Sequence, residues 1–126
     1  MQTNAVRRVI GTNVMAPAMK RTILERFDVP DSNYETVMVL VELPPGANTG
    51  LHTHPGFDVA YLIEGDLTVI TLGQPDKTFG PGQSWHVAPG VIHEVKAGRE
   101  PVKAVGAYIV EKGKPMVIPY EPLQSN

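Results

Sequence analysis

Glycine and proline interrupt this chain so often that little room is left for helices. Each occurs 12 times among the 126 residues, spread along the whole length. No window of about 12 or more residues keeps a helical apolar period free of both. Short runs rich in valine, isoleucine, threonine and aromatic residues lie between the interruptions. The pattern predicts an all-β fold with little helix.

Turn sequences set the limits of the predicted strands. Typical examples are Pro44-Pro45-Gly46, Pro55-Gly56 and Gly80-Pro81-Gly82. We expect strands at residues 20–28, 35–43, 49–54, 57–64, 66–72, 76–79, 84–88, 92–97 and 101–111. Many short strands at this spacing favour an antiparallel sandwich or barrel.

The length of the chain suits one compact domain. We expect an irregular N-terminal arm at residues 1–19, the folded domain at 20–112 and an extended tail at 113–126. The tail contains Pro115, Pro119 and Pro122, which oppose a regular continuation of the fold.

Charge and composition exclude several classes of function. A net charge of −2 offers no basic surface for a phosphate backbone, so we expect no nucleic-acid partner. No apolar run approaches the roughly 18 residues of a membrane span. The absence of cysteine excludes disulfides and thiolate metal sites.

The N-terminal residues resemble a targeting segment in one respect only. Arg7 and Arg8 precede a short apolar stretch, but Gly11, Thr12 and Asn13 interrupt it. We therefore favour a cytoplasmic protein.

Three of the four histidines form a candidate metal site together with one aspartate. His52 and His54 are two residues apart, a spacing that places both imidazoles on one face of a strand. Asp58 follows after a turn, and His93 begins a later strand that antiparallel pairing can bring alongside. Three neutral nitrogens and one oxygen suit a divalent transition metal. A bare His-x-His pair is equally typical of two surface histidines, with an unrelated aspartate nearby.

Glycines at fixed distances from these residues favour the metal site. Residues 46–65, GANTGLHTHPGFDVAYLIEG, match every spacing of the first cupin motif, G-x5-H-x-H-x3-(E)-x6-G. Residues 82–97, GQSWHVAPGVIHEVKA, resemble the second motif at Gly82, Gly90 and His93. The chain therefore resembles the small single-domain cupins over most of residues 36–111. The resemblance implies a double-stranded β-helix, a jelly-roll barrel of two antiparallel sheets with a metal ion inside.

The chain departs from the family pattern at three positions. Asp58 stands where the family usually has glutamate, and its side chain is one methylene shorter. It reaches a metal only if its backbone lies closer, and otherwise it holds a water. Ala88 replaces the first proline of the second motif, with Pro89 following, and Ala97 replaces the final asparagine. These two changes affect turns more than chemistry.

The resemblance leaves several functions open. With Fe, Mn, Ni or Cu, it implies a metal-dependent dioxygenase that acts on a small organic molecule, and this is the reading we favour. With Zn, the same site would serve an isomerase, a hydrolase or a decarboxylase. A barrel that binds or senses a small ligand without chemistry is the alternative from a different class. A metal-free sugar-nucleotide epimerase-like cupin conflicts with the intact histidine pair.

Two further expectations concern residues outside the ligand set. His86 is a candidate acid–base group, although a lone histidine is more often a partly buried structural residue. Similar barrels often form homodimers through N-terminal strands, so residues 20–28 are the candidate paired edge. Within that strand, Lys20 and Arg21 are expected to be ordinary surface charges.

Overall fold

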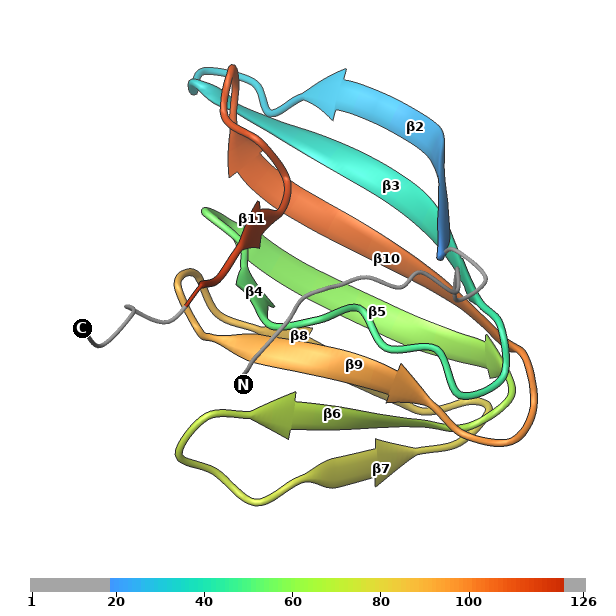
Figure 1. Ribbon diagram of the computed structural model, residues 1–126. Helices are drawn as coiled ribbons and strands as arrows, with labels where there is room; N and C mark the ends of the chain where they lie inside the picture. Colours follow the sequence, from blue (N-terminus) through green and yellow to red (C-terminus); the bar gives the residue numbers. More distant parts are fainter. Residues whose placement is uncertain (1–18, 122–126) are drawn as a thin grey trace.

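The computed structural model describes residues 19–121, which form two five-stranded antiparallel sheets (Figure 1). The first sheet has the strand order β2-β3-β10-β5-β8, and the second has the order β11-β4-β9-β6-β7. The strands span Lys20–Asp28 (β2), Tyr34–Leu43 (β3), His52–Thr53 (β4), Phe57–Glu64 (β5), Leu67–Thr71 (β6), Lys77–Phe79 (β7), Ser84–Val87 (β8), His93–Ala97 (β9), Val102–Glu111 (β10) and Ile118–Pro119 (β11). No helix occurs in the described part of the chain, and none there could therefore cross a membrane.

The predicted all-β jelly roll is confirmed, and nearly every predicted strand is present within one or two residues of its expected limits. The exception is the segment at 49–54, where regular pairing is confined to β4. The structure also contains β11, which was not predicted from the sequence. Its residues 118–119 pair with β4 at the edge of the second sheet. The N-terminal arm lies outside the described residues except for Met19.

The core lies between the sheets because each strand alternates inward apolar and outward residues. Along β10, the odd-numbered and even-numbered positions differ clearly in exposure, with the inward set almost fully buried. Two buried clusters result. One contains Leu43, Leu62, Leu67, Val69, Ala97, Val102 and Ala104, and the other contains Val37, Val39, Tyr108 and Val110. Apolar side chains therefore fill much of the space between the two sheets.

A glycine of the first motif closes the turn between β5 and β6. Gly65 has a φ of +83°, which L side chains rarely adopt. A Cβ atom there would lie 2.4 Å from the carbonyl oxygen of Pro101. Glycine is thus required at position 65 for two reasons. The backbone has a positive φ there, and the segment that leads into β10 lies too close to leave room for a side chain.

Candidate metal centre

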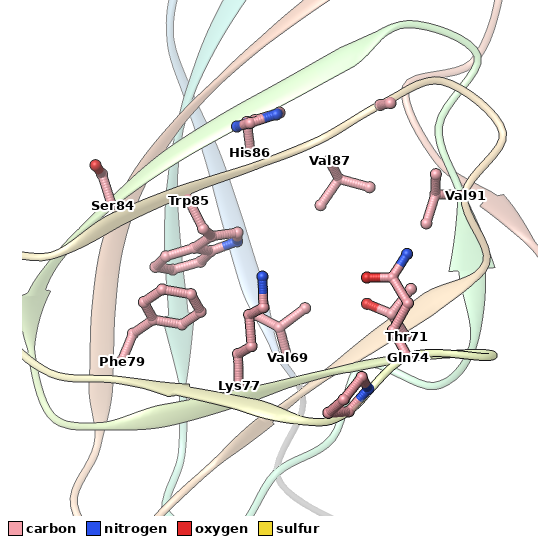
Figure 2. A pocket seen from close by; sticks show the side chains of 12 residues that line it. Val69, Thr71, Gln74, Lys77, Phe79, Ser84, Trp85, His86, Val87 and Val91 are labelled. Atoms are coloured by element: carbon pink, nitrogen blue, oxygen red, sulfur yellow. The ribbon is translucent and has the colours of Figure 1, made fainter.

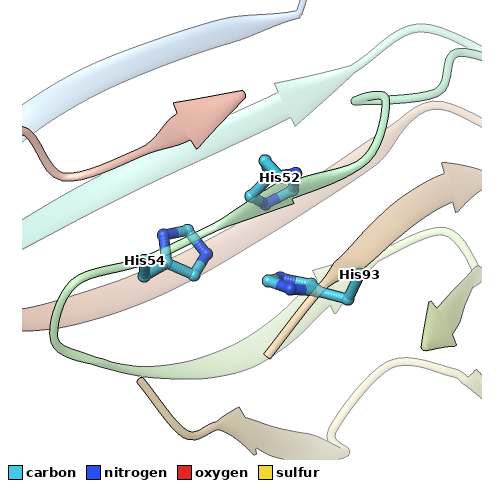
Figure 3. Close-up of side chains that lie close together, drawn as sticks. All are labelled: His52, His54 and His93. Carbon is cyan, nitrogen blue, oxygen red and sulfur yellow. The ribbon is translucent and has the colours of Figure 1, made fainter. Parts of the chain in front are cut away.

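His52, His54 and His93 meet between the two sheets because β4 and β9 are neighbours (Figure 3). His52 and His93 are direct antiparallel partners, and His54 follows His52 on the same face. The ring centroids are 4.3 Å apart for His52 and His93, 4.9 Å for His52 and His54, and 5.0 Å for His54 and His93. One ligand nitrogen from each ring lies within 4.8 Å of the others, and the group could hold a metal ion.

Each imidazole is fixed at Nδ1 by a backbone carbonyl. His52 Nδ1 donates to Gly50 O at 2.8 Å, and His93 Nδ1 donates to Val91 O at 3.0 Å. His54 Nδ1 donates to Met116 O at 2.8 Å, from the tail that leads into β11. A proton on Nδ1 leaves a lone pair on Nε2, so all three rings are in the tautomer that binds metal through Nε2. The donors of this group are therefore oriented before any ligand is bound.

The buried environment of His54 fits a cation. Its side chain is 2% exposed, and Nε2 has no hydrogen-bond partner. Asp58 Oδ2, on β5 in the opposite sheet, lies 3.3 Å from this nitrogen without the geometry of a hydrogen bond. A buried nitrogen facing a carboxylate oxygen in this way needs an explanation. A metal ion between the three rings and Asp58 supplies one, since it would accept both lone pairs.

Burial keeps the histidines in the form that coordinates metal. It lowers the pKa of His52 from 6.5 to about 4, with smaller contributions from neighbouring His93 and His54 opposed by the Gly50 carbonyl. Burial also lowers the pKa of His93. Both rings are therefore neutral at pH 7, and their lone pairs are available.

The group opens into a cavity of about 50 Å³ between the sheets. On the side of the first sheet its floor includes the small residues Ala60, Ala104 and Gly106, and Trp85 contributes part of the wall. Such a volume holds only a few water-sized groups. The site is thus suited to an ion and a small molecule.

Two polar side chains of the cavity were not predicted from the sequence. Arg21 lines it, and its Nε is buried, so the expectation that Arg21 is an ordinary surface charge is wrong. Tyr108 also lines it, beside His54 at a ring separation of 5.0 Å. Burial, with the charge of Asp58, raises the pKa of Tyr108 to about 12 against the opposing influence of Arg21. The inward direction of Arg21 depends on its register against Val41, which no local signal reveals.

The structure does not bring His86 to the other histidines. It pairs with Val59 on the outward side of β8, whereas Trp85 and Val87 point inward. His86 lines a separate pocket of about 440 Å³ between β8 and the β6–β7 hairpin (Figure 2). Trp85 and Phe79 stack there at a ring separation of 5.0 Å and contribute to its wall. A catalytic role for His86 in the histidine cavity therefore gains no geometric support.

The chain belongs to the cupin family. The sequence model described as Cupin domain matches residues 39–115, which include both motifs and all three histidines. No curated protein matches the chain closely enough to count as a relative.

Solved cupin structures have the same fold at low sequence identity. A cupin superfamily protein from Desulfitobacterium hafniense has 13% identity and a TM-score of 0.64, covering 79% of this chain and 84% of its own. The DMSP lyase DddQ from Ruegeria pomeroyi has 19% identity and a TM-score of 0.63, covering 75% and 47%. Oxalate oxidase bound to the substrate analogue glycolate has 20% identity and a TM-score of 0.57, covering 66% and 45%. The chain thus spans less than half the length of the lyase and the oxidase.

Proposed function

We propose that the protein is a metal-dependent enzyme that acts on a small organic molecule, with a dioxygenase-type reaction. His52, His54, His93 and Asp58 would hold one divalent transition metal ion, chosen from Fe, Mn, Ni, Cu and Zn. The observation that carries the proposal is the common orientation of the rings, each fixed at Nδ1 by a carbonyl. When bound, the ion supplies Lewis acidity and, if redox-active, electron transfer to dioxygen.

The residues of the cavity would position the substrate and exclude water. The small floor residues Ala60, Ala104 and Gly106 leave space beside the histidines, and Trp85 closes part of the wall. Tyr108, whose hydroxyl keeps its proton at neutral pH because its pKa is about 12, can donate a hydrogen bond to a bound molecule. Nothing in this arrangement requires a movement of the sheets.

The shortage of acid–base groups favours oxygenase chemistry over proton transfer. Within the described residues, Asp58 is the one carboxylate that lines the cavity, and His86 does not line it. If Asp58 binds the ion, no separate carboxylate base is left for an isomerase or a lyase. A substrate that reacts with dioxygen on a redox-active ion needs less help from protein bases.

The alternatives are a redox-inert metal enzyme and a barrel that binds or senses a ligand without chemistry. The structural neighbours include both an oxidase and a lyase, so the fold is compatible with more than one reaction. A cytoplasmic location stays a prediction, because the residues of the N-terminal arm that bear on it lie outside those described.

Elemental analysis of protein purified without added metal, combined with an oxygen-uptake screen over small organic acids, tests the proposal. We expect about one equivalent of iron, manganese, nickel or copper per chain. We also expect uptake of dioxygen in the presence of at least one of the acids. Zinc without uptake would favour the redox-inert or binding alternatives. A preparation that binds none of these metals would contradict the metal site itself.

We also propose that the protein is a homodimer, with a second copy packed on the outer face of the first sheet. Seven large apolar side chains lie 38–54% exposed on that face: Phe27, Met38, Phe57, Val59, Tyr61, Ile63 and Ile109. Together they leave on the order of 600 Å² in water, near the roughly 800 Å² per partner of a standard interface. A register shift between Ile23 and Glu25 interrupts edge strand β2 and disfavours the alternative, pairing along its edge.

A further inference from the structure

The cavity beside the histidines is lined by a cation that forms no salt bridge with any described residue. Arg21 lies on β2 at the edge of the first sheet, opposite Val41, and lines the same cavity as His52, His54 and His93. Its Nε–H is buried and donates to no acceptor among the described atoms. The same cavity is lined by Tyr108, and the charge of Arg21 lowers the pKa of both His52 and Tyr108.

The Arg21 side chain is half-buried with its Nε fully buried, and a guanidinium in such a place is stabilised by a negative charge nearby. Arginine stays protonated at any physiological pH, so it does not escape the cost of burial by losing its proton. Within residues 19–121, no carboxylate forms a salt bridge with Arg21. Asp58 shares the cavity, but its Oδ2 faces His54 Nε2 at 3.3 Å. The counter-charge of Arg21 is therefore left for a ligand to supply.

We propose that Arg21 binds the carboxylate of a small organic acid whose other oxygen faces the ion held by the three histidines. This inference rests on the proposed metal site and specifies its substrate class. A guanidinium presents parallel N–H donors that match the two oxygens of a carboxylate. The neighbouring Tyr108 hydroxyl adds a neutral donor beside the same cavity.

The size and charge of the cavity favour a carboxylate over a phosphate ester. About 50 Å³ admits a molecule of only a few water-sized groups beside an ion. Arg21 is the single arginine or lysine that lines the cavity within the described chain. A phosphate normally gathers several cations or a row of backbone N–H groups. A divalent ion and Arg21 together outweigh the charge of Asp58, so an anionic ligand is favoured over a neutral one.

The test compares glycolate with glycolamide, its neutral amide, by isothermal titration of the metal-loaded full chain. The variants are Arg21→Gln, which removes the charge, Arg21→Lys, which keeps the charge but loses the paired donors, and Arg26→Gln as the matched control. Arg26 lies on the same strand, but its side chain is 52% exposed and its Nε pairs with Glu35 Oε1 at 3.3 Å. Metal content and thermal unfolding are measured for every variant.

We expect Arg21→Gln to weaken glycolate binding by about 10–100-fold, the scale of charge-assisted hydrogen bonds. The same variant should bind glycolamide and metal almost as the wild type does. The affinity of Arg21→Lys for glycolate should lie between those of the wild type and Arg21→Gln. The affinity of Arg26→Gln for glycolate should equal that of the wild type. A folded, metal-loaded Arg21→Gln or Arg21→Lys protein that binds glycolate as tightly as the wild type would overturn the inference alone. A wild-type protein that takes up no metal would overturn the proposed function. It would also overturn the proposal that a carboxylate lies between Arg21 and the ion.

Discussion

At the scale of single residues, the site depends on imidazoles that are fixed at one nitrogen and free at the other. The carbonyls of Gly50, Met116 and Val91 hold the three Nδ1 atoms. Such contacts orient metal ligands and raise their basicity. Burial opposes protonation, so His52 stays neutral well below its ordinary pKa. The metal-free protein therefore holds an oriented set of donors, of which His52 and His93 are kept neutral by burial.

The lowered pKa of His52 predicts that the metal-free protein loses stability as the pH falls from about 6.5 to about 4. In that range the unfolded chain takes up a proton near 6.5, whereas folded His52 resists protonation down to about 4. The unfolded state then binds more protons, so the free energy of unfolding decreases with decreasing pH. Urea denaturation at several pH values measures it. His52→Gln should show a shallower dependence, and an equal slope in both proteins would contradict the explanation.

The sequence predicted the ligand candidates but not the residues around them. The spacing of His52 and His54, and the position of His93 after a turn, are local patterns that survive folding. Arg21 was misjudged because its inward direction follows from pairing with Val41, far along the chain. The contact to Met116 was invisible because a backbone carbonyl carries no sequence signature.

At the scale of elements, the C-terminal tail is tied to the metal centre. β11 pairs with β4, the strand that begins at His52, and Tyr120 N donates to Leu51 O at 3.0 Å. Met116 O, just before β11, accepts from His54 Nδ1. The tail thus supports two of the three histidines, although it adds little to the apolar core.

Removing residues 116–126 should weaken metal binding while the two sheets persist. The truncation deletes β11 and the Met116 carbonyl, so His54 loses the contact that fixes its ring. Loss of such an outer contact typically costs about 10–100-fold in metal affinity. Competition with a chromophoric chelator measures it, and circular dichroism reports the sheet content. A matched truncation of residues 122–126 should bind metal normally. Equal affinity in the two truncated proteins would show that the tail is dispensable.

The strands themselves were largely predictable, since turn residues and β-branched runs are local features. β11 was not, because its proline-containing segment has no alternating pattern and, as the edge strand of the second sheet, pairs only with β4. Short edge strands depend on an existing sheet, and a sequence pattern does not show where that sheet ends.

At the scale of the whole molecule, the two faces of the first sheet carry different kinds of side chain. The inner face carries Arg21, Asp58 and Tyr108 toward the cavity. The outer face exposes large apolar side chains, among them Phe57, Val59 and Tyr61. An exposed apolar surface of this extent is at the upper end of what monomers present, and such surfaces are often functional. The first sheet would therefore face the histidines of the second sheet on one side and form the subunit interface on the other.

Val59→Glu should convert the proposed homodimer into a monomer. Val59 is 46% exposed near the middle of the outer face, where a buried carboxylate would face the second copy. Leu72→Glu is the control, since Leu72 is 50% exposed but follows β6 in the second sheet. Light scattering after size exclusion gives the mass. A monomeric wild type would contradict the interface, as would a dimeric Val59→Glu protein.

The most direct test of the metal site is the metal content per chain of the wild type, His93→Gln and His86→Gln, purified side by side. Glutamine removes the imidazole in both variants, but only His93 belongs to the buried group, while His86 lies outside it. We predict about one divalent transition metal per chain in the wild type and His86→Gln, and almost none in His93→Gln. Retention of the metal by a folded His93→Gln protein, or its loss from His86→Gln, would contradict the assignment of the site.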